Sequence, residues 1–346
     1  MGSGTRTKVL LCPAASGPHL QLLKRYLEKR GVEVRCISWF GRQTPWSIAQ
    51  LFVRRLQGFK VMNLNWLPFN NRAEMRLARL SCRLLGIRMV WTVHNLSPHS
   101  VQFGSRGADQ MAMRYVQAWA DRGVVHSERT KNDFQALFGQ ELPLDVIPLA
   151  NYFDVVAKAD AELSRRKLLL PPDKTIVLMI GPNRWNKGIR SYLRVVSSLP
   201  ESYLGVLAGS CRDREIADLI RRYEEEHPGR FRAVLERLDE STIAEYYAAS
   251  DIVFMPFEDI TTSASIMEAI SQGKAVVSTD RGNMSMLIKN GANGYLAGSE
   301  DEMRERLMSI DRNTARSMGE RSLEVAGSYT WEESASRYES IFKELL

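Results

Sequence analysis

A short segment after an apolar run has the composition of a phosphate-binding turn. The run Thr175–Ile180 is typical of a buried strand, and Gly-Pro-Asn-Arg-Trp-Asn-Lys-Gly follows it directly. Gly181 and Gly188 let the backbone approach a ligand closely. Arg184 and Lys187 supply two cations one helical turn apart, and a helix starting near Gly188 adds free backbone amides. The turn therefore suits a diphosphate, although it is no P-loop, and a strand-to-helix turn with two solvated bases fits it equally well.

A second candidate anion site lies about 80 residues further along the chain. Residues 261–263 (Thr-Thr-Ser) are good caps for a helix that runs to Gln272. The small side chains at positions 263–265 leave the amides of the first turn open to an anion. Glu268 lies one turn further on, where its carboxylate is placed to accept hydrogen bonds from ribose hydroxyls. A capped helix with a surface glutamate is the simpler alternative.

The third candidate site contains two histidines that follow the strand-like run Arg88–Val93. They are His94 and His99, in the segment Thr-Val-His-Asn-Leu-Ser-Pro-His. Imidazole titrates near neutrality and suits acid–base work or hydrogen bonding. A lone histidine is more often structural, but two of them at the carboxyl end of a strand make a site an equal alternative.

Together these segments resemble parts of the GT-B glycosyltransferases. The nearest likeness is to glycosyltransferase family 4 and to related bacterial polysaccharide-assembly glycosyltransferases. It covers residues 175–346 well and residues 1–150 more loosely. Each motif alone is weak, but their shared order is specific. In chain order, the segments are TVHNLSPH, GPNRWNKG, TTSASIMEAISQGKAVVSTDRGNMSMLIKNGANGYL and YTWEESASRYESIF.

The resemblance implies a fold, an activity and a donor. The fold is an α/β GT-B architecture, with two Rossmann-like doubly wound domains that face a central cleft and a C-terminal helix that crosses back to the N-terminal domain. The activity is that of a hexosyltransferase whose donor is a nucleotide-diphosphate sugar. No obligatory metal and no other cofactor are implied.

The resemblance also implies a role for each matching residue. Arg184 and Lys187 would hold the diphosphate, the amides of residues 263–265 would assist them, and Glu268 would bind the ribose. The residues after the strand near Phe231–Leu235 would lie near the base, and the loop after the first strand would face the donor. The substrate-binding set is Gly17, Gly181, Arg184, Lys187, Arg237, Leu238, Ser263, Ala264, Ser265 and Glu268, and His94 is the catalytic candidate near the transferred sugar.

One position departs from the family pattern. Family 4 members often carry two glutamates eight positions apart; Glu268 matches the second, but Ile260 occupies the place of the first. The sequence therefore leaves open both the sugar and whether the transfer retains or inverts its stereochemistry. Inversion requires a base from the first half of the chain, and the candidates are His94, His99, Asp109 and Glu128.

Charge is distributed unevenly along the chain. The net charge is +7, yet residues 1–150 hold 21 Lys and Arg against nine Asp and Glu. Four arginines recur at spacings of 4, 3 and 4 on a predicted helix over Arg72–Leu85, so they share one face with Leu77, Leu80 and Leu84 beside it. The upstream segment Trp46–Leu56 mixes aromatic, aliphatic and basic residues. These patterns favour a basic surface on an anionic membrane, and solvated arginines on ordinary domain helices are the alternative. The four arginines are Arg72, Arg76, Arg79 and Arg83.

Composition excludes several classes of protein. Hydrophobic residues make up 44% and charged residues 25%, which are ordinary globular values. No apolar run approaches the ~20 residues that span a bilayer, and the apolar start of the chain is too short for a signal peptide. The four cysteines lie far apart without a CxxC pair, which predicts no zinc site and no disulfide framework. We expect a cytoplasmic protein that lies peripherally on the inner face of the membrane.

Apolar runs alternate with helical patterns through both halves of the chain. This alternation predicts βαβ units and mostly parallel sheets. The pattern restarts near Thr175, after a polar connection that ends in Pro171-Pro172-Asp173. We therefore expect an acceptor-side domain over 1–152 together with a crossing helix over 330–346, and a donor-binding domain over 153–329.

The resulting hypothesis is transfer of a sugar from a nucleotide-diphosphate sugar to a hydroxyl acceptor, which is a glycan or lipid-linked intermediate of polysaccharide assembly. A nucleotide-sugar epimerase on the same fold is the first alternative, and activity without an acceptor would support it. A non-catalytic nucleotide- or nucleic-acid-binding protein is the second. No helix-turn-helix, zinc-finger, RRM or KH signature supports nucleic-acid binding, so no such partner is expected.

Overall fold

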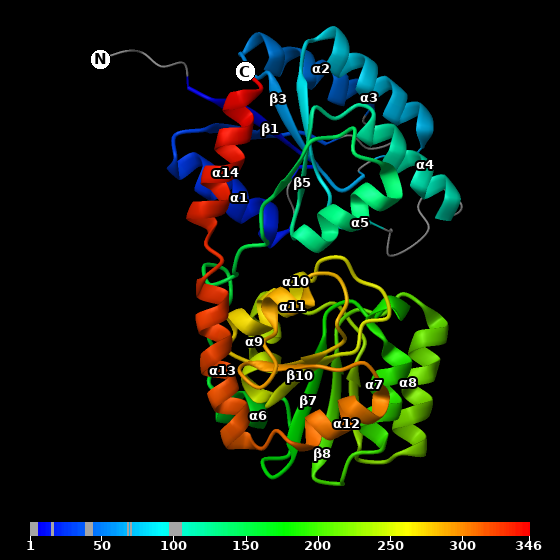
Figure 1. Ribbon diagram of the computed structural model, residues 1–346. Coiled ribbons are helices and arrows are strands. Elements are labelled where there is room, and N and C mark those ends of the chain that lie inside the picture. The colour runs from blue at the N-terminus through cyan, green and yellow to red at the C-terminus, as the bar shows by residue number, and fades with distance from the viewer. Residues whose placement is uncertain (1–5, 15–16, 39–43, 68, 70, 97–105) are drawn as a thin grey trace. The chain divides into compact units, whose positions relative to one another are not determined.

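Two compact units make up the protein, each an α/β layer structure (Figure 1). The computed structural model describes residues 6–14, 17–38, 44–67, 69, 71–96 and 106–346. Unit 1 comprises residues 1–149 and 329–346, and unit 2 comprises residues 150–328. Each unit is considered by itself below.

The sheet of unit 1 has six parallel strands in the order β2-β1-β3-β4-β5-β6. The chain builds β1 and β2 in one direction and then continues on the other side of β1, so the strand order reverses between β1 and β3. Ligands of open α/β sheets bind at such a reversal, beyond the carboxyl ends of the strands. The strands are β1 (Lys8–Cys12), β2 (Glu33–Cys36), β3 (Val61–Asn65), β4 (Arg88–Thr92), β5 (Arg122–Val125) and β6 (Leu144–Val146).

Helices cover this sheet, and one of them comes from the end of the chain. The helix α14 packs on α1, where its buried Trp331 lies against His19 and Tyr26. An ion pair of 2.6 Å between Arg30 and Glu339 reinforces the contact. The expected return of the C-terminal helix to the N-terminal unit is therefore confirmed. The helices are α1 (Pro18–Lys29), α2 (Thr44–Leu56), α3 (Arg72–Leu84), α4 (Arg106–Gln117), α5 (Glu128–Phe138) and α14 (Trp331–Glu344).

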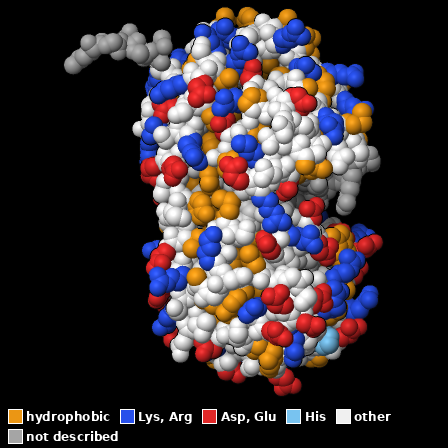
Figure 2. Space-filling model, in the orientation of Figure 1, with side chains coloured by type: hydrophobic (Ala, Val, Ile, Leu, Met, Phe, Trp, Pro, Cys, Tyr) orange, Lys and Arg blue, Asp and Glu red, His pale blue; other side chains and the backbone are white. Residues whose placement is uncertain are grey.

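The helices α2 and α3 pack on each other and carry an unusual outer surface. The core side of α3 is formed by Met75, Ala78, Ser81 and Cys82. Its opposite side exposes leucines, and α2 exposes a stripe of large apolar side chains. Figure 2 shows basic and apolar side chains intermixed over this end of unit 1. The exposed apolar residues are Trp46, Phe52, Val53, Leu56, Leu77, Leu80 and Leu84, with exposed fractions of 39–77%.

The four arginines of α3 are not equivalent, which corrects the expectation of one uniform basic face. Arg79 is half-buried, its guanidinium lies 5.1 Å from the ring centre of Tyr115, and it donates to the carbonyl oxygen of Ala118. The other three arginines of the row are exposed. None of the helices in the described ranges combines the length and apolar character that crossing a bilayer demands.

The sheet of unit 2 also has six parallel strands, in the order β12-β11-β10-β7-β8-β9. Its order reverses between β7 and β10. Both strands are buried, which is why Thr175–Ile180 reads as a continuous apolar run. The strands are β7 (Thr175–Ile180), β8 (Tyr203–Ala208), β9 (Phe231–Val234), β10 (Ile252–Met255), β11 (Ala275–Ser278) and β12 (Gly294–Leu296).

The remaining helices surround this second sheet. They are α6 (Ala161–Lys167), the 3₁₀ turn η2 (Trp185–Lys187), α7 (Ile189–Ser197), α8 (Arg214–Glu226), α9 (Glu240–Ala249), α10 (Ala264–Ser271), α11 (Met284–Leu287), α12 (Glu300–Met308) and α13 (Arg312–Gly327).

Gly188 fixes the turn after β7 against the end of β10. Its φ is 74°, and an added Cβ would lie 1.8 Å from the carbonyl oxygen of Pro256. A side chain at this position is excluded both by the backbone conformation and by space. The close approach brings the two segments with candidate chemistry to the same edge of the sheet.

Candidate functional site

The loop after β7 and the start of α10 meet around the ammonium of Lys187. This side chain turns back and donates to the carbonyl oxygen of Ile180 over 2.7 Å. A Cβ built on Gly181 would lie 2.8 Å from Lys187 Nζ and 3.6 Å from Ser265 Oγ. Gly181, Lys187 and Ser265 therefore surround one small volume, at the point where the strand order of unit 2 reverses.

Lys187 is a buried cation, and Arg184 is an exposed one. Only 8% of Lys187 is accessible to solvent. Burial lowers the pKa of Lys187 to about 8; the nearby Arg184 contributes to this shift and Glu268 opposes it. The Arg184 side chain makes no hydrogen bond or ion pair with the described residues, so its guanidinium is available to an external anion. Two adjacent cations with so little countercharge favour an anionic ligand.

The first turn of α10 presents its backbone toward the same place. Ser263 is the N-cap, and its Oγ accepts a hydrogen bond of 3.1 Å from the amide of Ile266. The amides of the first turn of a helix have no partner within the helix, and here Ala264 and Ser265 carry only small side chains. The positive end of the helix dipole adds to the cations of the β7 loop.

Glu268 lies one turn into α10 and is largely buried. Burial raises the pKa of Glu268 to about 7, and Lys187 limits the rise. Glu268 in turn raises the pKa values of Tyr152 and Tyr247, although burial is the larger cause for both. The carboxyl group is thus poised between its two protonation states near neutral pH, as a hydrogen-bonding partner of a hydroxyl would be.

The two residues predicted near the base lie at the end of β9. Arg237 and Leu238 line a hollow of about 600 Å³ together with Asp239, Glu240 and Ser241. Asp239 caps α9, and hydrogen bonds from Thr242 and Ser241 lower the pKa of Asp239 to about 2. This hollow lies at the same sheet edge as Lys187, with β8 between β7 and β9.

Gly17 and His94 belong to unit 1 and lie at the carboxyl edge of its sheet. Gly17 is the N-cap of α1 without a side-chain cap, and a Cβ built on it would meet no atom within 4 Å. Among the other proposed bases, Asp109 is fully buried on α4 and Glu128 is exposed at the start of α5. His99 lies outside the described residues.

His94 is part of a buried row of hydrogen bonds. Its Nδ1 lies 3.1 Å from Nε2 of His126, whose Nδ1 lies 2.8 Å from the carbonyl oxygen of Ile147. On its other side, His94 Nε2 lies 3.1 Å from Asn65 Oδ1. The row continues from Asn65 to Asn63, then to Thr92 and to the hydroxyl of Tyr338 on α14.

This row constrains the protons that the two imidazoles carry. The carbonyl of Ile147 only accepts, so His126 donates to it from Nδ1, and a neutral His126 then accepts from His94 at Nε2. A neutral His94 that carries its proton on Nδ1 has only a lone pair at Nε2. Asn65 Oδ1 also only accepts, so no hydrogen lies between these two atoms. The hydrogen-bond row therefore favours one more proton on His94 and His126 than the two neutral rings carry. Burial opposes this, because it lowers the pKa of both rings. In this arrangement both nitrogens of His94 contact the protein.

Two further side chains around His94 were not singled out by the sequence analysis. Trp66 stacks on His94 with ring centres 4.6 Å apart, has a φ of 58° and is 41% exposed. A left-handed tryptophan at a strand end is a feature that clusters at functional sites. His19 packs 5.1 Å from His94, and its two ring nitrogens are buried without a partner among the described residues. The only sequence signals were a Trp directly after β3 and, beyond His94 and His99, two more histidines in the same half of the chain, His19 and His126.

A metal site is not apparent in the described ranges, where no group of three or more His, Cys, Asp or Glu side chains is arranged to hold an ion.

Comparison with known proteins finds a family model that is similar to most of unit 2. Residues 160–324 match the model described as glycosyl transferases group 1. D-inositol 3-phosphate glycosyltransferase of Corynebacterium kroppenstedtii is 28% identical over 246 residues, covering 66% of this chain and 54% of that protein. Its counterpart in Corynebacterium diphtheriae is 25% identical, covering 75% of this chain and 66% of that protein. The chain thus aligns with about half to two thirds of the length of these relatives.

Solved structures share the whole fold at low sequence identity. A sucrose-phosphate synthase from Thermosynechococcus elongatus superposes with a TM-score of 0.80 at 17% identity, covering 98% of this chain and 99% of that one. Anabaena HepE in complex with UDP and glucose gives a TM-score of 0.77 at 15% identity, covering 98% and 100%. The expected GT-B fold is confirmed, and residues 160–324 are similar to glycosyl transferases group 1. Membership of family 4 in particular stays a prediction.

The two cations of the β7 loop are expected to bind a diphosphate. Arg184→Ala and Lys187→Met should each weaken the affinity for UDP or GDP by about 10–150-fold, because a charge-assisted contact contributes roughly 1.5–3 kcal/mol. Isothermal calorimetry measures this loss, and Arg222→Ala, an exposed arginine on α8, is the matched control. Unchanged affinity in both folded variants would remove the diphosphate from this loop.

Glu268 is expected to recognise ribose. Glu268→Gln should weaken binding of a nucleoside diphosphate more than binding of its 2′,3′-dideoxy analogue, because the analogue already lacks the proposed contact. The two dissociation constants are compared in each protein. Equal losses for both ligands would assign Glu268 a structural role.

The three buried histidines of unit 1 should make the fold sensitive to acid. Burial, together with the charge of His126, lowers the pKa of His19 to about 3; burial lowers that of His126 to about 4 and that of His94 well below 6.5. The unfolded chain takes up these protons near pH 6.5, so stability is complete above that pH and falls as the pH drops toward 4.

Thermal unfolding between pH 7.5 and pH 4.5 tests this dependence. His126→Gln should flatten the decline relative to wild type, whereas His227→Gln, on the surface of unit 2, should leave its slope unchanged. Parallel curves for wild type and His126→Gln would contradict the account.

Proposed function

We propose that this protein transfers a sugar from a nucleotide-diphosphate sugar to a hydroxyl acceptor. The observation that carries the proposal is the position of the Lys187 ammonium, between Gly181 and the first turn of α10, with Glu268 close enough to shift its pKa. The match of residues 160–324 to glycosyl transferases group 1 and the named relatives support the same reading.

The donor end of unit 2 can supply what the reaction needs from its own side chains. As the bond between the anomeric carbon and the diphosphate oxygen breaks, negative charge grows on the leaving diphosphate. Arg184, Lys187 and the amides at the start of α10 are placed to stabilise that charge without further reorganisation. The hexosyl group and a metal-independent reaction remain part of the proposal.

The acceptor end belongs to unit 1 in this proposal. His94 contributes through its fixed ring rather than as a free base, because both nitrogens are already hydrogen-bonded. The exposed face of Trp66 offers an apolar platform for the C–H face of a sugar ring. Gly17, with open space at its Cα, lets a ligand approach the start of α1.

We propose a lipid-linked acceptor, and the outer surface of α2 and α3 supports this choice. Seven exposed apolar side chains and the exposed arginines Arg72, Arg76 and Arg83 form one mixed surface. Such a face suits the boundary between headgroups and acyl chains of an anionic bilayer. A peripheral position on the cytoplasmic side of the membrane follows from the same proposal.

A soluble phosphorylated acceptor is the second candidate. The relatives from Corynebacterium are named for D-inositol 3-phosphate, and one structural neighbour is named sucrose-phosphate synthase. Transfer assays with a lipid-diphosphate glycan in one arm and inositol 3-phosphate in the other distinguish the two acceptors. Donor turnover without either acceptor would instead indicate an epimerase.

His94 is expected to act in turnover rather than in donor binding. His94→Ala should lower kcat strongly while the affinity for the nucleotide changes little, because the ring lies in unit 1 and a transition-state contact shows in kcat. Steady-state rates and calorimetry separate the two effects, with His227→Ala as the control. A near-normal kcat in folded His94→Ala would exclude a central role.

The surface of α2 and α3 is expected to bind anionic membranes. Replacing Arg72, Arg76 and Arg83 by Gln should reduce recovery with phosphatidylglycerol liposomes in a flotation assay, since each charge near the surface contributes ~1 kcal/mol and salt screens the attraction. The variant should keep its nucleotide affinity.

Two further variants complete this experiment. Leu80→Ser with Leu84→Ser should lose binding at all salt concentrations, because it removes apolar contact rather than charge. Gln at Arg212, Arg214 and Arg222, three exposed arginines of unit 2, removes the same charge elsewhere and should have no effect. Failure of wild-type protein to float with anionic liposomes at low salt would refute the membrane surface and leave the transferase proposal intact.

A further inference from the structure

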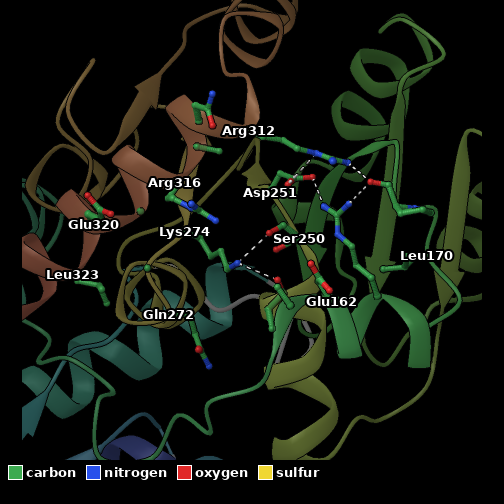
Figure 3. A pocket seen from close by; sticks show the side chains of 18 of the residues that line it. Glu162, Leu170, Ser250, Asp251, Gln272, Lys274, Arg312, Arg316, Glu320 and Leu323 are labelled. Atoms are coloured by element: carbon green, nitrogen blue, oxygen red, sulfur yellow. Dashed lines mark hydrogen bonds and ion pairs between the residues drawn. The ribbon is translucent and has the colours of Figure 1, made fainter.

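Unit 2 contains a second hollow that no part of the proposed donor end lines. It is a cavity of about 940 Å³ between α6 and α13 (Figure 3). Its floor comes from the residues that lead into β10 and β11, among them Asp251 and Lys274. The cavity therefore lies at the amino-terminal edge of the sheet, whereas Lys187 and Glu268 lie at the carboxyl edge. Its size is that of a small-molecule site.

Two arginines and one aspartate of this cavity are paired with each other and with backbone groups. Asp251 accepts from Arg165 over 2.7 Å and from the amide of Ile176 over 2.6 Å, and it lies 3.8 Å from Arg312. Both arginines also donate to the carbonyl oxygens of Pro172 and Lys174. These contacts hold the chain before β7 against α13, and they leave Arg165 and Arg312 with a structural role.

Three other cations remain available. Lys274 donates to the carbonyl oxygens of Ser250 and Ala248 over 3.0 and 3.5 Å, which uses two of its three N–H groups. Arg166 on α6 and Arg316 on α13 are exposed, and neither side chain makes a hydrogen bond or ion pair with the described residues. Figure 3 shows Arg316 and Lys274 on the same side of the hollow.

The electrostatics of the cavity floor also favour an anionic ligand. Burial lowers the pKa of Lys274 to about 8; Asp251 opposes the shift and Arg165 adds to it. Five cationic side chains line the cavity against three carboxylates, so an anion placed there would restore the balance.

The rest of the lining narrows the class of ligand. It contains no aromatic side chain, so it offers no stacking partner for a nucleotide base. Glu162, Glu320, Gln272 and Asn313 provide acceptors and amides around the rim, which suit hydroxyl groups. Small residues, including Ala161, Ala248, Ala315, Gly273 and Gly319, leave the space open. Gly319 is required to be small, because a Cβ there would lie 2.2 Å from the carbonyl oxygen of Gly273.

We propose that this cavity binds a phosphorylated sugar or polyol. The phosphate lies against Lys274, Arg166 and Arg316. The hydroxyl groups face Glu162 and Glu320 at the rim. The site is independent of the donor end, and binding to it is measurable whether or not the protein transfers a sugar.

A ligand in this cavity would connect the helices α6 and α13. The first helix that the chain forms in unit 2 is α6, and the last before it returns to unit 1 is α13. A ligand held by Arg166 on one helix and Arg316 on the other joins these two elements. Binding should therefore slow hydrogen exchange in both helices and leave the first turn of α10, at the donor end, unaffected.

Calorimetry with glucose 6-phosphate, inorganic phosphate and glucose tests the proposal. Glucose 6-phosphate should bind more tightly than phosphate, and glucose alone should not bind. The double variant Arg166→Gln with Arg316→Gln, whose side chains are exposed, should lose at least ~10-fold in affinity. The matched double variant Arg212→Gln with Arg222→Gln and the donor-end variant Arg184→Ala should both retain it.

The remaining outcomes contradict the proposal. Absence of binding to wild-type protein would overturn it, as would unchanged affinity in the Arg166 and Arg316 double variant. Loss of binding in Arg184→Ala would place the phosphate at the donor end instead. Hydrogen-exchange protection at the first turn of α10, and not at α6 and α13, would also place the phosphate at the donor end.

Discussion

The buried ammonium of Lys187 is the feature on which the donor end depends. Its hydrogen bond to Ile180 fixes the loop after β7, and its position excludes any side chain at Gly181. Burial and Arg184 make the ammonium less stable than a solvated one, so a negative ligand has a large favourable interaction to supply. Gly188 holds the same loop against the end of β10, which is what brings Ser265 and Glu268 within reach.

The two units place different chemistry on similar six-stranded parallel sheets, whose strand order reverses after two strands in unit 1 and after three in unit 2. Unit 2 gathers positive charge at its strand reversal, whereas unit 1 gathers the imidazoles that follow β1, β4 and β5. The row from His126 to Tyr338 joins this cluster to α14, so the last helix of the chain contributes to the environment of His94. Of the two roles that the sequence offered for His94, acid–base work or hydrogen bonding, the contacts at both ring nitrogens favour hydrogen bonding.

Much of the fold could be predicted because central parallel strands such as β7 and β10 are continuous apolar runs followed directly by glycine or proline. Thr175–Ile180 matches β7 residue for residue, and Arg88–Val93 exceeds β4 by one residue. The donor candidates Lys187 and Glu268 were found because they follow such runs at recognisable spacings. Trp66 and His19 were missed because their importance comes from contacts between separate strands, which no local pattern records. The exposure of Leu77, Leu80 and Leu84 was equally hidden, since helical periodicity does not say which face meets the core.

The central proposal is that unit 2 holds a nucleoside diphosphate at the reversal of its strand order. A crystal structure with UDP, or with whichever nucleoside diphosphate stabilises the protein most in a thermal-shift panel, tests it most directly. The account predicts phosphate oxygens within hydrogen-bond distance of Lys187 Nζ and of the Ser265 amide, the Arg184 guanidinium beside them, and the ribose at Glu268. A nucleotide bound elsewhere in unit 2, with Lys187 still bonded only to Ile180, would contradict it.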